Sequence, residues 1–251
     1  MVIIGFVDAK LLILIINKVQ KLLHKVEKYS VCDSFTTLVN YFTNRIFRVI
    51  VLIFARKGLT LLLFETKTKN EKDMKVCVFC SANNDIDPQF FEKTDELGRW
   101  LAKNGHSIVY GGCNQGLMEC IAKAAHEVGG RLIGVIPTKL EEHGRVSSYI
   151  DVNIPVDNLN DRKQLMMEMS DVFIVLPGGI GTLDEIFSVA ASATIGYHQK
   201  KIILYNINGF WDSLVALLDD MNEKKMLRKP WRNQISVATC LEDVAGALVD
   251  I

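Results

Sequence analysis

The most informative stretch of the sequence is LPGGIGTLDE, at residues 176–185. Gly178, Gly179 and Gly181 let the backbone approach a ligand closely, because glycine has no Cβ atom. A helical pattern follows at once, so free N–H groups and the positive end of the helix dipole point into the same space. Thr182 adds a hydroxyl group. The loop therefore predicts a phosphate site, although the Gly-Lys-Ser/Thr ending of a P-loop is missing.

Glu185 lies three residues after Thr182, and two interpretations of it stay open. The two residues fit the capping box T-x-x-E, in which the glutamate only satisfies a backbone N–H at the helix start. Alternatively, a carboxylate one turn from a phosphate site can act on the ribose of the same ligand. Cleavage of a glycosidic bond builds positive charge on the sugar, and carboxylates stabilise that charge or activate water. The local pattern favours the cap, and the neighbouring glycine loop favours catalysis.

A second glycine-rich loop, YGGCNQGLM at residues 110–118, also joins a predicted strand to a predicted helix. Alone it is weak evidence for a ligand, because such turns also serve helix–strand packing. Two glycine-rich loops on one sheet edge suggest a phosphorylated ligand that spans neighbouring strands.

Two further segments carry polar side chains. Arg162 and Lys163 lie near a predicted helix N-terminus, where positive charge opposes the dipole. They form either a solvated charged face or a cationic pair aimed at an anionic ligand. The segment FCSANN, at residues 79–84, either lines a pocket with small polar groups or makes an ordinary turn.

The elements that must position these loops alternate between short Val/Ile-rich strands and helices. Strands are predicted at 75–80, 107–110, 132–136, 151–156, 172–176, 201–205 and 235–238. Helices are predicted at 89–104, 115–128, 160–169, 182–195, 209–222 and 241–250. This order predicts an α/β fold, a Rossmann-like doubly wound parallel sheet with helices on both faces. Ligands bind such sheets at the carboxyl ends of the strands.

Charge is divided unevenly along the chain. Residues 1–73 hold 12 of the 29 basic and 6 of the 29 acidic residues, so this part is +6 and the remainder is −6. The folded part has no basic footprint, and we expect no nucleic-acid partner. Cys77 and Cys80 form a C-x-x-C inside a predicted strand, where residues three apart face opposite sides. We therefore expect reduced thiols, no metal site and a cytoplasmic location.

Residues 1–73 differ in character from residues 74–251, which we expect to form the catalytic domain. The apolar run 11–17 is too short to span a bilayer, and the run 46–64 is interrupted by three basic residues. A membrane partner is therefore not expected. This extension is a non-native translated stretch upstream of a start at Met74, a basic membrane-surface appendage or a helical accessory domain. We favour the first interpretation, because the α/β pattern begins at Met74.

Residues 74–250 resemble the Lonely Guy (LOG) family of cytokinin riboside 5'-monophosphate phosphoribohydrolases, also labelled possible lysine decarboxylases. The family pattern P-G-G-x-G-T-x-x-E is complete at residues 177–185. The pattern G-G-G-x-x-G-L-M-G is partly present at 111–119, where Cys113 and Glu119 replace glycines. M-H-x-R-K keeps its Arg and Lys at 162 and 163 but loses Met and His. F-C-G-S is partly kept at 79–82, and GVIP is present at 134–137.

The resemblance implies a homodimer that hydrolyses the N-glycosidic bond of cytokinin riboside or AMP-like 5'-monophosphates, without metal or cofactor. By position, Arg162 and Glu185 are the catalytic pair. Glu185 would stabilise the oxocarbenium-like ribose and orient water, while Arg162 would position the phosphate and the substrate. The substrate-binding residues implied are Ser81, Gly112, Gly116, Lys163, Gly178, Gly179, Gly181 and Thr182.

Two other functions compete with this one. A non-catalytic carrier of a nucleotide or of molybdenum cofactor on the same fold is the alternative, and the presence of both Arg162 and Glu185 favours the enzyme. Lysine decarboxylation normally needs pyridoxal phosphate on a Schiff-base lysine. The sequence shows no lysine beside the phosphate loop in a setting that marks this role.

Overall fold

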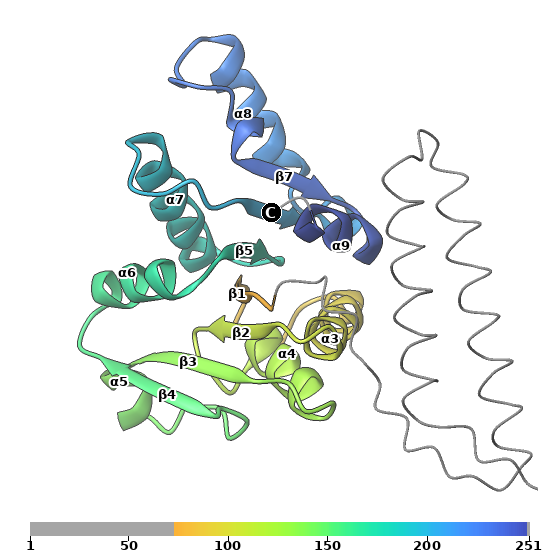
Figure 1. The fold of residues 1–251 in the computed structure, drawn as a ribbon, viewed down its shortest axis with the longest axis vertical. Coiled ribbons are helices and arrows are strands. Elements are labelled where there is room, and N and C mark those ends of the chain that lie inside the picture. The colour runs from red at the N-terminus through yellow and green to blue at the C-terminus, as the bar shows by residue number, and fades with distance from the viewer. Residues whose placement is uncertain (1–72, 250–251) are drawn as a thin grey trace, which may run out of the picture. The chain divides into compact units, whose positions relative to one another are not determined.

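The computed structural model describes residues 73–249, so the predicted extension 1–73 lies outside them apart from its last residue. The described part is one seven-stranded parallel sheet with helices on both faces (Figure 1). The predicted α/β class and doubly wound sheet are thus confirmed. The strands are β1 Lys75–Phe79, β2 Ser107–Tyr110, β3 Leu132–Pro137, β4 Val152–Val156, β5 Val172–Val175, β6 Ile202–Tyr205 and β7 Ile235–Ala238.

Helices connect consecutive strands, as the alternating pattern predicted. The α-helices are α3 Pro88–Lys103, α4 Gly116–His126, α5 Thr138–Glu142, α6 Leu159–Met169, α7 Ile180–Thr194, α8 Asp212–Glu223 and α9 Leu241–Val249. The short helix α5 was not predicted, because five residues are too few to show a helical period. Helix α7 begins two residues earlier than expected, inside the glycine-rich loop.

The strand order β4-β3-β2-β1-β5-β6-β7 places the reversal of the chain between β1 and β5. From β1 the chain builds the sheet outward through β2, β3 and β4, then returns to add β5 on the other side of β1. The loops that follow β1 and β5 therefore diverge from adjacent strand ends. In open α/β sheets this switch point is where ligands bind.

Two apolar cores cover the two faces of the sheet. Alternate residues of each strand point to opposite faces, so Val76 and Val78 join one core while Cys77 and Phe79 join the other. Helices α3, α4 and α9 cover the first face, and α6, α7 and α8 cover the second (Figure 1). Each face of the sheet is thus covered by one layer of helices, and the loops at the strand ends connect the sheet to these layers.

The C-x-x-C pair behaves as the strand pattern predicted. Cys77 and Cys80 are free, buried and divided between the two cores. Burial raises the pKa of both thiols well above the usual value. Both sulfur atoms are therefore neutral packing groups at physiological pH.

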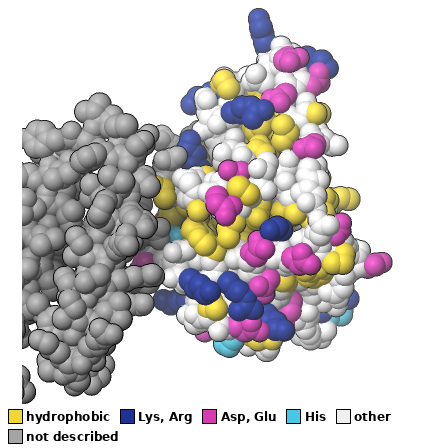
Figure 2. Space-filling model, turned by 90° about the vertical axis from the view of Figure 1, so that its right-hand side faces the viewer, with side chains coloured by type: hydrophobic (Ala, Val, Ile, Leu, Met, Phe, Trp, Pro, Cys, Tyr) yellow, Lys and Arg dark blue, Asp and Glu magenta, His cyan; other side chains and the backbone are white. Residues whose placement is uncertain are grey.

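Within residues 73–249, no helix combines the length and apolar character that a bilayer crossing demands. Figure 2 shows acidic and basic side chains interspersed over the face that it presents, rather than gathered in one basic stripe.

Close packing of α3 on α4 depends on Gly98. A Cβ atom there would lie 2.9 Å from the carbonyl oxygen of Ile121 on α4. Gly98→Ala should destabilise the protein by roughly 1–3 kcal/mol, because a backbone atom must move to admit the methyl group. Equilibrium urea unfolding of the full chain measures the change.

Gly246 on α9 is the matched control, since a Cβ atom there meets nothing within 4 Å. Gly246→Ala should stabilise the protein by about 0.5–1 kcal/mol through helix propensity alone. Equal effects of the two substitutions would contradict the packing argument.

Candidate active site

Backbone hydrogen bonds join three of the strand-end loops at the carboxyl edge of the sheet. The Ser81 N–H, after β1, donates to the Pro177 carbonyl, after β5, at 3.0 Å. The Leu117 N–H, after β2, donates to the Ser81 carbonyl at 2.9 Å. The segment after β1 is therefore a brace between the two glycine-rich loops. The Ser81 hydroxyl accepts from the Asn83 N–H, so its side chain serves this turn.

The glycines after β2 are explained by packing. Gly116 has a φ of +59°, and a Cβ atom would lie 2.5 Å from the backbone carbon of Ala82. Its N–H donates to Oδ1 of Asn84 at 2.7 Å. Gly112 has a φ of +73°, and a Cβ atom would lie 2.5 Å from Cγ1 of Ile136. Protein atoms thus fill the space beside both glycines, as helix–strand packing requires.

The glycines at the start of α7 differ in this respect. Side-chain space at Gly179 and Gly181 is open, with no atom within 4 Å of an added Cβ. Gly178 lies under the side chain of Thr182, which is buried. The first N–H groups of a helix have no carbonyl partner within it. An exposed, unobstructed helix N-terminus therefore lies at the switch point, which is the geometry that an anion prefers.

The capping-box interpretation of Thr182 and Glu185 is wrong. The N-cap of α7 is Gly179, no side chain caps the helix, and Thr182 and Glu185 both lie inside it. Because the helix starts at Ile180, the Glu185 carboxylate is too far along to reach the free N–H groups at the start. It is free to point across to α6.

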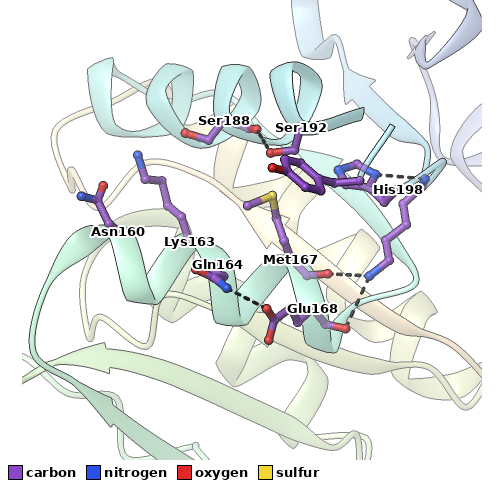
Figure 3. A pocket seen from close by; sticks show the side chains of 10 residues that line it. Asn160, Lys163, Gln164, Met167, Glu168, Ser188, Ser192 and His198 are labelled. Atoms are coloured by element: carbon purple, nitrogen blue, oxygen red, sulfur yellow. Dashed lines mark hydrogen bonds between the residues drawn. The ribbon is translucent and has the colours of Figure 1, made fainter. Parts of the chain in front are cut away.

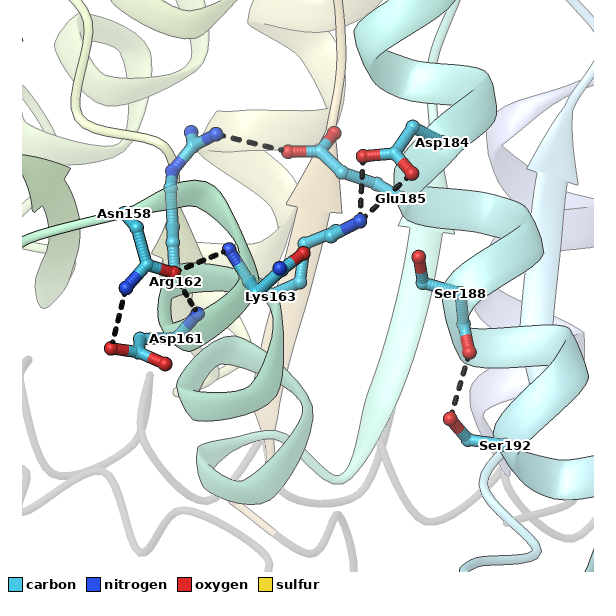
Figure 4. Close-up of polar contacts among 9 residues, drawn as sticks. Asn158, Asp161, Arg162, Lys163, Asp184, Glu185, Ser188 and Ser192 are labelled. Atoms are coloured by element: carbon cyan, nitrogen blue, oxygen red, sulfur yellow. Dashed lines mark hydrogen bonds and ion pairs between the residues drawn. The ribbon is translucent and has the colours of Figure 1, made fainter.

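Glu185 and Arg162 meet at the edge of the sheet (Figure 4). Nη1 of Arg162 donates to Oε1 of Glu185 at 3.3 Å, from α6 to α7. The two side chains are 11% and 6% exposed, respectively, which excludes a solvated charged face for Arg162. The structure thus brings together the two residues that the resemblance implied to be catalytic.

Arg162 is held in place by two further features. Its Nε donates to the carbonyl oxygen of Val135, on β3, at 3.1 Å. Its Nη2 occupies the space where a side chain on Gly111 would be, so a larger residue there would displace the guanidinium group. The guanidinium group therefore lies across the ends of β2 and β3 and reaches Glu185 beside β5. Neither contact is visible in the sequence, because the partners are separated by many residues.

Burial dominates the electrostatics of Glu185. Desolvation raises the pKa of its carboxyl from 4.5 to about 7, against the lowering effect of the Arg162 charge. Asp184 raises this pKa further and Lys163 lowers it. A carboxyl group that titrates near neutral pH is typical of acid–base and charge-stabilising roles in active sites.

A second ion pair lies outside the first. Nζ of Lys163 donates to both carboxylate oxygens of Asp184, at 2.7 and 2.8 Å. Lys163 is 16% exposed and Asp184 is 52% exposed. The cationic pair of α6 therefore faces carboxylates in this structure. Asp184 was not predicted, because its partner comes from another helix.

The N-cap of α6 positions Arg162 and Lys163. Oδ1 of Asn158 accepts from the N–H groups of Asn160 and Asp161, both at 2.9 Å. This cap starts the helix one turn before Arg162 and Lys163. Their charges then lie on the side of α6 that faces α7 (Figure 4).

A groove of about 660 Å³ runs between α6 and α7 (Figure 3). Its walls include Lys163, Gln164 and Ser188, and it ends near Tyr197 and His198. Neither Arg162 nor Glu185 lines it. The reactive groups thus belong to the strand edge, where the open helix N-terminus is, and not to this groove.

Lys163 is the lysine that the structure brings to the site, and its setting is not that of a Schiff-base lysine, as the sequence led us to expect. Its ammonium group is engaged by Asp184, whereas a Schiff base with pyridoxal phosphate needs a free amine. The residues present do not fit that cofactor. Among residues 73–249, no three His, Cys, Asp or Glu side chains are grouped as metal ligands.

Comparison with known proteins gives a consistent family. The model of a family described as "Possible lysine decarboxylase" matches residues 118–248. A probable cytokinin riboside 5'-monophosphate phosphoribohydrolase of Oryza sativa subsp. japonica is 33% identical over 170 residues, 68% of this chain and 69% of its own. A cytokinin riboside 5'-monophosphate phosphoribohydrolase of Arabidopsis thaliana is 35% identical over 155 residues, 62% and 70% of the two chains.

Solved structures share the fold. A molybdenum cofactor binding protein from Rippkaea orientalis has a TM-score of 0.56 at 24% identity, covering 71% of this chain and 97% of that one. The molybdenum cofactor carrier protein of Chlamydomonas reinhardtii has a TM-score of 0.54 at 22% identity, covering 71% and 98%. At these identities the likeness shows the architecture alone.

The raised pKa of Glu185 predicts a pH-dependent stability difference. The folded state binds this proton more tightly than the unfolded state, so the stabilisation is complete below about pH 4.5 and lost as pH rises to about 7. Glu185→Gln should therefore gain stability relative to the wild type between pH 5 and pH 8, by about 1–3 kcal/mol. Urea unfolding at both pH values measures this gain.

Glu223→Gln is the control, because Glu223 is exposed on α8. It should change stability equally at pH 5 and pH 8. A Glu185→Gln difference that does not vary with pH would refute the placement of a proton on buried Glu185.

Proposed function

This chain belongs to the Lonely Guy family, whose model is described as possible lysine decarboxylase, and we propose that it hydrolyses the N-glycosidic bond of nucleoside 5'-monophosphates. It is a hydrolase of N-glycosyl bonds, like its named relatives. The proposed substrates are cytokinin riboside 5'-monophosphates or AMP-like nucleotides, and the products are the free base and ribose 5-phosphate. The observation that carries this proposal is the buried contact of Arg162 with Glu185 beside the open N-terminus of α7.

The 5'-phosphate is placed at the start of α7. Open space beside Gly179 and Gly181 admits the phosphate oxygens to within reach of the first N–H groups. Thr182 supports the loop from below, through its packing on Gly178. Lys163 adds positive charge one residue from Arg162. Gly112, Gly116 and Ser81 act on the site through loop packing.

The proposed role of Glu185 is at the anomeric carbon. Its carboxylate lies on the second turn of α7, so a nucleotide with its phosphate at the helix start brings the ribose close to it. As the bond to the base breaks, the ribose gains positive charge, which the carboxylate stabilises. As the bond between the anomeric carbon and the base nitrogen breaks, water adds its oxygen and one hydrogen to that carbon, and its other proton goes to the departing base. Arg162 orients the carboxylate and the anionic substrate.

Buried placement makes this chemistry efficient. A charge that develops beside Glu185 in a water-poor site is stabilised more strongly than in bulk water, because the local dielectric is low. The carboxyl group must be ionised for this role, so activity should rise as pH passes through about 7.

A carrier of nucleotide or molybdenum cofactor remains the alternative function. The carrier function is supported by the fold that this chain shares with the two molybdenum cofactor proteins. That likeness concerns the fold and says nothing of a binding site. The pairing of a buried arginine with a buried, proton-binding glutamate favours the hydrolase, because binding an anion does not call for a carboxylate.

A homodimer is part of the proposal. Ile180 and Phe187 of α7 and Ile195, its C-cap residue, are 86%, 41% and 62% exposed and recur at helical spacing. Tyr197, two residues further along the chain, is 81% exposed. An apolar stripe of this kind next to the site is typical of an interface. The described cysteines are free thiols, which supports a cytoplasmic location.

Activity is tested by chromatographic detection of free base, with AMP and isopentenyl-adenosine monophosphate offered separately to the full chain. Glu185→Gln should lower kcat by at least about 100-fold, since it loses a charge used in the transition state. Arg162→Ala should lower kcat and raise KM, because it loses orientation and charge together.

Glu223→Gln on α8 serves as the control and should retain wild-type turnover. If the wild type binds the nucleotide tightly but releases no base, the hydrolase proposal is rejected in favour of the carrier function. The ratio of the two wild-type rates decides between cytokinin and adenine nucleotides.

The dimer is tested by light scattering coupled to size-exclusion chromatography. Phe187→Asp should shift the protein from dimer to monomer, because it places a charge in an apolar interface. Leu217→Asp, on the exposed side of α8, should leave the dimer intact. A wild type that elutes as a monomer at tens of micromolar would reject the proposed assembly.

A further inference from the structure

Two consecutive basic residues of α6 face two consecutive acidic residues of α7 (Figure 4). The inner pair, Arg162 with Glu185, is buried, and the outer pair, Lys163 with Asp184, lies towards solvent. The inner pair forms one hydrogen bond of 3.3 Å, whereas the outer pair forms two, of 2.7 and 2.8 Å. The stronger contacts therefore belong to the pair with no assigned chemical step.

Lys163 has a flexible side chain that starts one residue from Arg162. Glu185 lies next to Asp184 in the chain, so both carboxylates are possible partners for the same ammonium group. The bidentate contact with Asp184 fixes Lys163 on the outer side. Without Asp184, the nearest described carboxylate on α7 for this ammonium group is that of Glu185.

We propose that Asp184 is a positioning residue that holds the Lys163 ammonium group away from Glu185. Arg162 is then the one cation that pairs with Glu185 among the described residues. The Glu185 carboxylate keeps a single, weak partner from which a substrate can displace it. This inference rests on the proposed hydrolase function and adds a residue to it.

The charges around Glu185 agree with this arrangement. Arg162 and Lys163 face it from α6 and Asp184 adjoins it on α7, while the thiols of Cys77 and Cys80, buried on opposite faces of the sheet, interact with it only electrostatically. Burial keeps both thiols neutral. The charge balance at Glu185 is therefore set by two cations and one neighbouring carboxylate.

The outer pair should contribute little to stability, because its carboxylate end is open to solvent although Lys163 is 16% exposed. Asp184 is 52% exposed, and ion pairs at such positions contribute little to folding because water screens them. Substitutions in this pair should therefore fold normally and report on chemistry. This property separates a positioning role from a structural one.

The test compares Asp184→Asn, Lys163→Met and the double variant in the full chain. Asp184→Asn should lower the saturated kcat about tenfold, because freed Lys163 binds Glu185 in competition with the developing ribose charge. Removing the lysine as well should restore kcat to within about twofold of the wild type. Both Lys163→Met variants should raise KM, since the positive charge that Lys163 adds near the proposed phosphate position is lost.

A substrate-independent readout accompanies the kinetics. Carbon NMR of the Glu185 carboxyl group should show a lower pKa in Asp184→Asn and a higher pKa in Lys163→Met, with the double variant between them. Asp220→Asn, which breaks the exposed Lys224–Asp220 pair on α8, should change neither kcat nor the titration.

The outcomes separate this inference from the proposed function. A wild type that releases no base overturns the proposed function, while an Asp184→Asn shift in the Glu185 pKa that is larger with Lys163 present than in the Lys163→Met background still supports the positioning of Lys163. An active wild type whose Asp184→Asn variant keeps full kcat, or whose double variant is not restored, overturns the inference. Glu185 titrations that do not differ among the variants overturn it as well.

Discussion

The burial of Arg162 and Glu185 in one place is the constraint on which the rest of the site depends. A buried ion is tolerated only with a partner and with hydrogen bonds, and the two side chains come from different helices. Helices α6 and α7 must therefore be held in fixed register by the sheet. The Val135 carbonyl and the bare backbone at Gly111 complete the constraint, because the first accepts a hydrogen bond from the guanidinium group and the second leaves room for it.

The glycines of the two loops divide by what lies beside them. Gly112 and Gly116 are required by close packing against protein atoms, whereas Gly179 and Gly181 border open space. The same residue type thus builds the wall of the site in one loop and leaves room for a ligand in the other. A phosphate held at the start of α7 would place a ribose near Glu185. The rise of the helix therefore sets the distance between the phosphate position and the carboxylate.

Opposing electrostatic effects on the Glu185 carboxyl group connect the structure of the site to its proposed function. Desolvation favours the neutral form of Glu185, and the Arg162 charge favours the ionised form. A carboxyl group that is balanced near neutral pH can respond to a cation that forms beside it. The outer ion pair extends this balance to the solvent side, where a second cation would otherwise compete. The lysine decarboxylase description of the family has no counterpart in this arrangement, because Lys163 is engaged by Asp184.

The sequence by itself determined the α/β class, the parallel sheet and the two glycine-rich loops, since these follow from local periodicity and from residues with special backbone freedom. It also marked Arg162 and Glu185 through a resemblance in motif. Local patterns did not decide whether Glu185 caps a helix or whether Arg162 is solvated. Only the tertiary structure settled both, because each answer depends on where α7 begins and on which side chains from distant segments share a low-dielectric space.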